Sequence, residues 1–307
     1  ERRPVSPFTP LFAALALGLA PAAAGAAGAA AEPALAEPAS YPEGPAVVGG
    51  ALYWAEMPLN RVRRYAQGRA STAWQEPGCG PTSVKPDGRG GFWVLCHLGH
   101  RVLRLDAAFN VVKRLEADGA GNALSWPNDA TVDSRGRLYF TSSGIFDLRA
   151  PAEGAVYFID RQDRVRRVAS GLRYANGVHL DEKRRRLYVS EHLQRRVLMG
   201  ELAAPGEVGP LRVFFDLNVP VLRRSDFAQA GPDGLLVNRD GSLYVAEYGA
   251  ARVLLVSAQG ALQRVIPVPT QFVTNFAYWA ERGEVIVTGT FDPDQRSMPG
   301  RVFTLPK

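Results

Sequence analysis

The chain has 307 residues, of which 46% are hydrophobic and 9% aromatic, and its formal net charge is +6. This composition excludes a disordered or fibrous chain and is sufficient for one large core or two smaller ones. Only four of the 36 basic residues are lysines, and no dense basic stripe with interleaved aromatics occurs, so the charge does not indicate a nucleic-acid partner.

Residues 1–36 have the features of an export signal. Arg2 and Arg3 precede an apolar stretch at residues 11–20, and small residues lead to Ala34-Leu35-Ala36, an A-x-A cleavage pattern. We therefore expect an exported protein, either periplasmic or secreted.

The alternative for this segment is an uncleaved membrane anchor. Pro21 and the Gly- and Ala-rich residues after it disfavour a stable span. We expect residues 37–42 to form a linker, and the protein to be free of the membrane once the signal is removed.

After residue 41 an aromatic-rich hydrophobic segment recurs six times. The copies are Leu52-Tyr53-Trp54, Phe92-Trp93-Val94, Leu138-Tyr139-Phe140, Leu187-Tyr188-Val189, Leu243-Tyr244-Val245 and Val285-Ile286-Val287. Most follow a Gly- or charge-rich turn, and each precedes another apolar segment that opens on Arg-Val or Ala-Val. Short strands at regular spacing without a helical period predict an all-β repeat fold. Units of about 45 residues with three or four strands are typical of propeller blades, so we predict a six-bladed β-propeller over residues 43–307.

The way in which the last repeat closes is left open by the sequence, because the chain stops after the third predicted strand of that copy. Either a segment before Tyr41 supplies a fourth strand, or this blade has three strands.

Each repeat begins with a short strand, and in a propeller such first strands line the central axis. Their starting positions, which we call the ring positions, all carry a side-chain oxygen: Glu43, Thr82, Asn128, Asn176, Asp233 and Asn275. Carboxylates and amide carbonyls without Cys or His suit a hard divalent cation such as Ca²⁺. The side chains two residues further on are all apolar, which predicts a dry channel below the ring: Pro45, Val84, Ala130, Val178, Leu235 and Ala277. For any single copy, a polar residue of a turn dipeptide is the competing interpretation.

Four of these segments resemble signature segments of the regucalcin (senescence marker protein)/gluconolactonase family. They are Tyr41-Pro42-Glu43-Gly44-Pro45, Trp126-Pro127-Asn128-Asp129, Ala175-Asn176-Gly177-Val178 and Gly231-Pro232-Asp233-Gly234-Leu235. The resemblance implies a six-bladed propeller with one axial divalent cation held by Glu43, Asn128, Asn176 and Asp233. It also implies that Asn128 ligates the metal or contacts substrate beside it, and that Asp233 is the catalytic carboxylate.

Trp126 is a departure from that family, whose sugar-lactone members carry an arginine at this position. An indole cannot replace a guanidinium in gripping polyhydroxy acids. With Trp126 and Asn128 as candidate substrate-binding residues, we expect a less polar lactone, ester or phosphoester.

The resemblance favours a metal-dependent hydrolase of a small lactone or ester, in which Ca²⁺ polarises the substrate oxygen and Asp233 is base or nucleophile. One alternative is a phosphoesterase of the diisopropyl-fluorophosphatase type. The other is a non-catalytic, ligand-binding propeller with a structural ion. We expect a small-molecule substrate and a monomer.

The remaining candidates are cysteines, histidines and a repeated glutamate. Cys79 and Cys96 fall at the same edge of the second repeat, where they either form a disulfide or stay free thiols. Each histidine could serve as a general base, but packing is the favoured interpretation for all of them: His97, His100, His179 and His192. A structural role is expected for the equivalent residues Glu56, Glu191 and Glu247.

Two longer loops follow the aromatic strands of the third and sixth repeats, at residues 142–154 and 289–300. Loops at the mouth of a propeller commonly carry specificity, and Ile145, Phe146 and Met298 could form an apolar wall there. We expect the basic run 183–186 to be a solvated hairpin tip on the opposite face.

Overall fold

The computed structural model describes residues 34–306. The predicted export signal lies outside these residues except for Ala34–Ala36. Among the described residues there is no helix with the length and apolar character needed to cross a membrane. The secondary structure of this part is strand, together with two 3₁₀ turns, η1 (Met57–Leu59) and η2 (His192–Gln194).

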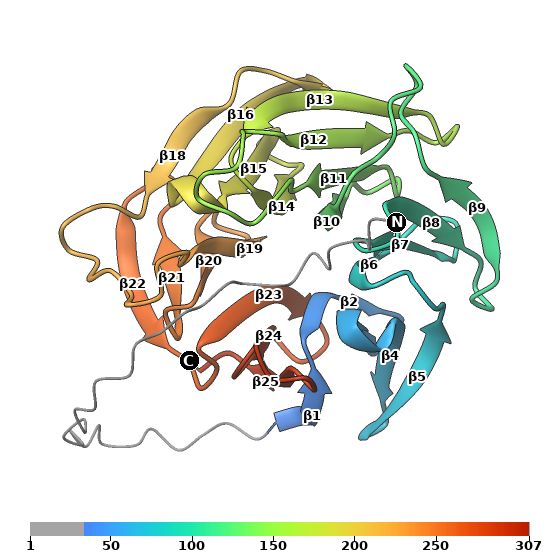
Figure 1. Ribbon diagram of the computed structural model, residues 1–307, viewed down its shortest axis with the longest axis horizontal. Coiled ribbons are helices and arrows are strands. Elements are labelled where there is room, and N and C mark those ends of the chain that lie inside the picture. The colour runs from blue at the N-terminus through green and yellow to red at the C-terminus, as the bar shows by residue number, and fades with distance from the viewer. Residues whose placement is uncertain (1–33, 307) are drawn as a thin grey trace, which may run out of the picture. The chain divides into compact units, whose positions relative to one another are not determined.

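Antiparallel sheets build the fold (Figure 1). One contains β2 (Pro42–Val48), β3 (Ala51–Glu56), β4 (Arg61–Ala66) and β5 (Arg69–Gln75). The next contains β6 (Pro81–Pro86), β7 (Phe92–Cys96), β8 (Arg101–Leu105) and β9 (Val111–Leu115). A third contains β10 (Pro127–Val132), β11 (Leu138–Ser142), β12 (Gly154–Ile159) and β13 (Val165–Leu172). A fourth contains β14 (Ala175–Asp181), β15 (Arg186–Glu191), β16 (Arg196–Ala204), β17 (Glu207–Val208) and β18 (Arg212–Asp216).

The remaining strands form an eight-stranded sheet made of two groups. The first group is β19 (Gly231–Val237), β20 (Leu243–Tyr248), β21 (Arg252–Val256) and β22 (Leu262–Pro267). The second group is β23 (Phe272–Trp279), β24 (Glu284–Thr290), β25 (Pro299–Thr304) and β1 (Ala34–Ser40). A single residue pair, Tyr248 with Phe272, joins the two groups.

The strands that open these groups lie innermost: β2, β6, β10, β14, β19 and β23 (Figure 1). We call them the first strands. Each contacts the next in chain order, and β23 contacts β2, so the circle is closed. The fold is therefore all-β and propeller-like, as the repeat predicts.

Hydrophobic cores lie between neighbouring sheets. Phe140 of β11 packs with Trp93 of β7, whereas Tyr139 packs with Val189 of β15. Successive side chains of a strand point to opposite faces, so the strands of a propeller bury both faces. This explains why the recurring segments are apolar at consecutive positions rather than at alternate ones.

Strand β1 answers the question of closure that the sequence left open. It pairs antiparallel with β25, and the carboxylate of Glu37 accepts a hydrogen bond from Arg301 Nε at 2.6 Å. A segment before Tyr41 thus supplies the fourth strand of the last group. Residues 37–42 are consequently not a linker, because β1 continues to Ser40 and β2 starts at Pro42. The composition of β1 concealed the strand, since Ala and Pro have low β-propensity.

The recurring Arg-Val pairs and the equivalent glutamates belong to one structural motif. Glu56 and Glu191 are the last residues of β3 and β15, and Glu247 is the penultimate residue of β20. Each forms an ion pair of 2.6 Å with the arginine five residues later. Glu56 also accepts a hydrogen bond from the backbone N–H of Ser40, and Glu191 from that of Arg173. The expected structural role of these glutamates is confirmed.

Cys79 and Cys96 form a disulfide at the edge of the β6–β7 hairpin. The bond closes a separation of 17 residues, which in the chain-entropy model stabilises the fold by about 3 kcal/mol. We predict that Cys79→Ser/Cys96→Ser unfolds at a lower denaturant concentration than the oxidised wild type. Urea titrations of the double variant, the oxidised protein and the reduced protein test this. Equal midpoints for all three would show that the bond contributes nothing.

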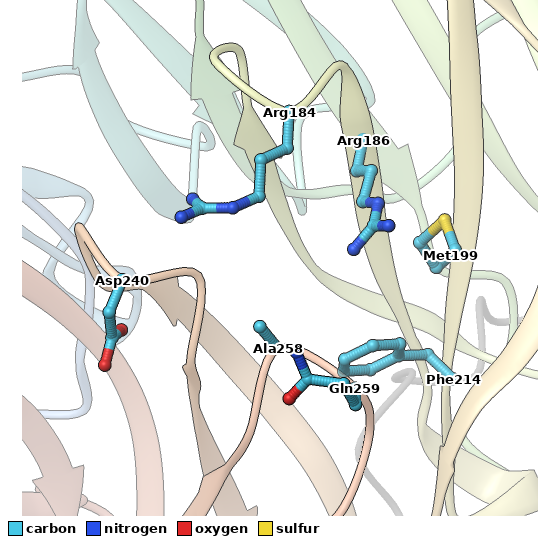
Figure 2. Close-up of a pocket in the computed structure, with 7 residues that line it drawn as sticks. All are labelled: Arg184, Arg186, Met199, Phe214, Asp240, Ala258 and Gln259. Atoms are coloured by element: carbon cyan, nitrogen blue, oxygen red, sulfur yellow. The ribbon is translucent and has the colours of Figure 1, made fainter.

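The basic run lies in the turn between β14 and β15, at the ends of the first strands away from the ring positions, as predicted. A hollow of about 460 Å³ opens beside it, lined by Arg184, Arg186, Met199, Phe214, Asp240, Ala258 and Gln259 (Figure 2). Arg184 is bound to the carboxylate of Asp181 at 3.0 Å and to the carbonyl of Arg239 at 3.2 Å. The guanidinium of Arg184 is therefore already paired within the protein.

Candidate functional site

Five of the ring positions are the second or third residue of a first strand, Asn275 is the fourth residue of β23, and all six are buried. Their exposed fractions are 5% for Glu43, 5% for Thr82, 7% for Asn128, 4% for Asn176, 2% for Asp233 and 2% for Asn275. Because the first strands contact one another in cyclic order, residues 39 to 57 positions apart in sequence share one end of the circle.

Glycines allow the first strands to approach one another at the ring. A Cβ on Gly44 would lie 2.3 Å from the carbonyl oxygen of Thr82, and one on Gly177 would lie 2.0 Å from that of Asp233. A Cβ on Gly234 would lie 2.6 Å from Asn275. These glycines therefore serve close packing between strands, which is a different role from that in a turn dipeptide.

Hydroxyl groups hold the backbone of the ring in place. Thr141 donates to the carbonyl of Asn176 at 2.6 Å, and Ser190 donates to that of Asp233 at 2.7 Å. Thr82 donates to the carbonyl of Asn128 at 2.7 Å. The Thr82 side chain is thus engaged in structure, which separates it from the four candidate ligands.

Asn275 differs from the candidate ligands in a similar way. Its Oδ1 accepts a hydrogen bond of 2.8 Å from the backbone N–H of Phe276, so its oxygen is satisfied within its own strand. The structure thereby divides the ring into two structural members, Thr82 and Asn275, and the four candidate ligands.

Carboxyl groups at the ring raise one another's pKa. Burial raises the pKa of Glu43, and the charge of Asp129 adds to the effect. Burial also raises the pKa of Asp233 well above its usual value, with further contributions from Glu43 and Asp129. These carboxylates lie close together with too little positive charge around them.

The third carboxylate, Asp129, was not among the candidates from sequence. Its Oδ2 accepts the backbone N–H of Val178 at 3.1 Å, and the ammonium of Lys85 lies near enough to lower its pKa against the effect of burial. When all are ionised, one positive charge faces three negative charges. The remaining two negative charges equal in magnitude the charge of a divalent cation.

Two buried oxygens at the ring have no hydrogen-bond partner, namely Asn176 Oδ1 and Asp233 Oδ1. Leaving such atoms unpaired costs free energy, and oxygens of this kind are the ligands that Ca²⁺ prefers. Among residues 34–306 no group of three or more His, Cys, Asp or Glu side chains is arranged to hold a metal. The ring instead combines two carboxylates with amides, and the unpaired oxygens show that these residues fit a hard cation.

The side chains two residues beyond the ring positions do not form the apolar channel lining that the sequence predicts. Each first strand has a register irregularity at or beside its ring residue. Such a bulge shifts the alternation of side chains. Val84, Ala130 and Val178 therefore point into the cores between sheets. Lys85 donates instead across to the carbonyl of Pro45 at 2.7 Å and lies within electrostatic reach of Asp129.

The histidines at the mouth form hydrogen bonds within the protein, as the packing interpretation predicts. His97 Nδ1 lies 3.0 Å from the carbonyl of Pro127, and His100 Nδ1 accepts the backbone N–H of Trp126 at 3.2 Å. Burial lowers the pKa of His97 and His192 to about 4. His192 differs from the others because it contacts a ring side chain, Asn176, at 3.1 Å.

An aromatic wall stands over one side of the ring. It consists of Phe146, Tyr174, His192, Phe227, Tyr248 and Phe272, linked by ring contacts of 4.7 to 6.3 Å. Gln229 Nε2 donates to the carbonyl of Phe146 at 2.9 Å, which ties loop 218–230 to loop 142–154. Of the three side chains expected to form this wall, Phe146 takes part, whereas Ile145 is 53% exposed. Met298 instead accepts the backbone N–H of Tyr41 through its carbonyl oxygen.

Three tyrosines at the site were missed by the sequence reasoning. Tyr41 and Tyr248 share a hydrogen bond of 3.3 Å between their hydroxyl oxygens. Burial raises the pKa of Tyr41, Tyr174 and Tyr248, and the charges of Glu43 and Asp233 contribute for each. The three phenols therefore stay protonated beside the two carboxylates and can donate hydrogen bonds there.

Comparison with known proteins identifies the family. Residues 41–290 match the family described as SMP-30/Gluconolactonase/LRE-like region. The chain belongs to this family. The resemblance found in the four sequence segments is thus confirmed.

Relatives in the family include enzymes named as lactonases. The chain is 27% identical over 235 residues to the 6-deoxy-6-sulfogluconolactonase of Pseudomonas putida, covering 75% of each chain. A gluconolactonase structure from Xanthomonas campestris has a TM-score of 0.72 at 22% identity, covering 89% of each chain. A calcium-binding regucalcin structure from Agrobacterium tumefaciens has a TM-score of 0.72 at 17% identity, covering 90% of this chain and 95% of that one. At these identities the two structures show the common fold.

In this member of the SMP-30/gluconolactonase family, Trp126 packs against two histidines. Its indole contacts the imidazoles of His100 and His97, with ring centroids 4.3 and 5.3 Å apart. Trp126 has a φ of 49°, a conformation that few non-glycine residues adopt, and is half-buried. The segment before Asn128 is thus shaped by aromatic packing.

Proposed function

We propose that this protein is a six-bladed propeller enzyme that hydrolyses a small lactone or ester with the help of one axial divalent cation, Ca²⁺ in the first instance. The six-bladed count treats the two four-stranded groups of the large sheet as separate blades, which the single residue pair between them supports. The lactonase names of its relatives support the reaction class.

The observation that carries this proposal is the pair of unpartnered, buried oxygens on Asn176 and Asp233 beside the carboxylate of Glu43. Glu43, Asn176 and Asp233 would hold the cation, and Asn128 would ligate it or contact substrate. The chemistry that a bound divalent cation supplies here is Lewis-acid polarisation of the substrate's carbonyl oxygen.

The remaining chemistry of the hydrolysis would depend on the protein's own side chains. Asp233 Oδ1 has no competing hydrogen bond, so the carboxylate is free to take a proton from water or to attack the carbonyl carbon. Tyr41, Tyr174 and Tyr248 donate hydrogen bonds to substrate oxygens, and the aromatic wall excludes bulk water from the reacting centre. Trp126 and the wall favour a substrate with an apolar body.

Export is part of the proposal. The disulfide supports an oxidising compartment, because such bonds persist outside the cytosol and are rare within it.

A hydrolysis panel tests the proposed activity. We expect turnover of apolar γ- and δ-lactones and aryl esters, weaker turnover of gluconolactone, loss of activity with a chelator and recovery with Ca²⁺. Faster turnover of a phosphotriester than of every lactone would favour phosphoester hydrolysis. If no member of the panel is turned over while Ca²⁺ binds, the ion is structural and the protein is a ligand-binding propeller.

A further inference from the structure

His192 lies between the backbone carbonyl of Gln229 and the side-chain amide of Asn176. It follows β15 in η2, is 1% exposed and belongs to the aromatic wall. Its Nε2 lies 2.8 Å from the carbonyl oxygen of Gln229, and its Nδ1 lies 3.1 Å from the side-chain nitrogen of Asn176. Both ring nitrogens are therefore engaged.

The contact with Gln229 determines where the proton sits. A backbone carbonyl can only accept a hydrogen bond, so Nε2 must carry the hydrogen. The ring is buried among Phe146, Tyr174 and Tyr248, which disfavours a second, charging proton. Nδ1 is consequently left with a lone pair and acts as an acceptor.

An accepting Nδ1 in turn determines the orientation of the amide. An asparagine side chain has one donating end and one accepting end, and only the NH₂ group can bind a lone pair. Asn176 must therefore turn Nδ2 toward His192. Its Oδ1 is left on the other side, where it is buried and has no partner.

Close packing keeps this arrangement rigid. The backbone N–H of His192 donates to the carbonyl of Tyr174 at 3.0 Å. A Cβ on Gly231 would lie 2.2 Å from the carbonyl oxygen of His192 and 2.8 Å from its Cδ2, so β19 is in contact with the histidine. Both the ring and the backbone of His192 are therefore in close contact with the neighbouring chain.

We propose that His192 is a positioning residue that fixes the side-chain amide of Asn176 with its oxygen free for a hard cation. The inference rests on the proposed cation site and adds a device that the four ligands alone do not contain. Without His192 the amide could present either end to the cation, and its NH₂ end would repel it. Partners outside the ligand shell commonly change metal affinity by about 10- to 100-fold.

Calorimetric titration of the chelator-treated full chain with Ca²⁺ tests the proposal. We expect His192→Phe, which keeps an aromatic ring in the wall, to bind Ca²⁺ about 10-fold more weakly than the wild type. His192→Asn restores an acceptor near the Nδ1 position, whereas His192→Gln preserves only a donor near the Nε2 position. Affinity should therefore be closer to that of the wild type in His192→Asn than in His192→Gln, the reverse of what a purely packing role of the loop contact predicts.

The background Asn176→Asp provides a matched control, because a carboxylate presents an oxygen whichever way it turns. The loss caused by His192→Phe should shrink or reverse in that background. Equal losses in both backgrounds, or no loss with Asn176 present, would overturn the positioning role while leaving the cation site intact. A wild type that binds no divalent cation would reject the site and this proposal together.

A spectroscopic measurement on the metal-free protein separates these failures further. Nitrogen-15 shifts of the His192 ring should show a protonated Nε2 and an unprotonated Nδ1 before any cation is added. A protonated Nδ1 in the metal-free protein would reject the assigned amide orientation, whatever the cation affinity.

Discussion

Glu43→Gln is expected to remove tight binding of a divalent cation. The substitution keeps the size of the side chain and one oxygen, but it leaves Asp233 as the only carboxylate among the ring positions. Since changes outside the ligand shell alone cost about 10- to 100-fold in affinity, loss of a ligating carboxylate should cost at least about 100-fold. Elemental analysis of the purified variant and Ca²⁺ titration measure the effect.

Asn275→Ala is the matched control for this prediction. Asn275 occupies an equivalent ring position, but its oxygen is already bound to the backbone of Phe276. Its removal should change Ca²⁺ affinity far less than Glu43→Gln does. Equal metal content in Glu43→Gln and the wild type would reject Glu43 as a ligand.

When chelator is present, Glu43→Gln is expected to stabilise the protein. Burial, aided by neighbouring carboxylates, raises the pKa of Glu43 and of Asp233 in the folded protein. A carboxyl whose folded pKa is raised opposes folding above its unfolded pKa, so at neutral pH the metal-free ring destabilises the protein. Glu43→Gln should accordingly melt above the metal-free wild type and below the Ca²⁺-loaded one.

The propeller could be predicted from sequence because its repeat consists of short residue patterns that recur along the chain. Each aromatic strand and each Arg-Val pair recurs with a direct physical cause, namely strands buried on both faces and ion pairs such as that between Glu56 and Arg61. The ring positions followed, because equivalent positions of a repeat meet at the axis.

Features that depend on register or on unique loops could not be predicted in this way. The bulges that direct Val84 into a core and leave Lys85 near the axis change no residue type, so the alternation of the sequence misleads. Strand β1 is rich in Ala and Pro and acquires its conformation only by pairing with β25. Tyr248 and His192 each follow one of the equivalent glutamates, but the residue type at that position does not recur from one repeat to the next, so the sequence does not mark it as functional.

Asp233→Asn is expected to abolish hydrolysis even when the cation site is full. Asparagine keeps the size of the side chain and one carbonyl oxygen as a ligand. It removes the charge, and with it the ability to take a proton from water or to attack an electrophile. Removing a general base costs about 10²- to 10⁴-fold in rate, and the loss of a nucleophile should cost no less.

The fold should survive this substitution, which makes the activity measurement interpretable. Asp233 packs at the ring rather than in a hydrophobic core, and a neutral amide relieves its repulsion with Glu43. The metal-free variant should therefore be at least as stable as the metal-free wild type, although it should bind Ca²⁺ more weakly. Melting curves with and without Ca²⁺ provide this control.

Titrating Ca²⁺ to saturation then separates the role of ligand from the role of catalyst. If Asp233 serves both roles, turnover should remain about 10²- to 10⁴-fold below the wild type at every occupancy. If saturating Ca²⁺ restores turnover to near the wild-type level, Asp233 is only a ligand. The proton acceptor would then have to be another group at the mouth, and His100 would be tested first. His100 is less buried than His97 and His192. Burial lowers its pKa, and its Nδ1 accepts a hydrogen bond from the backbone N–H of Trp126.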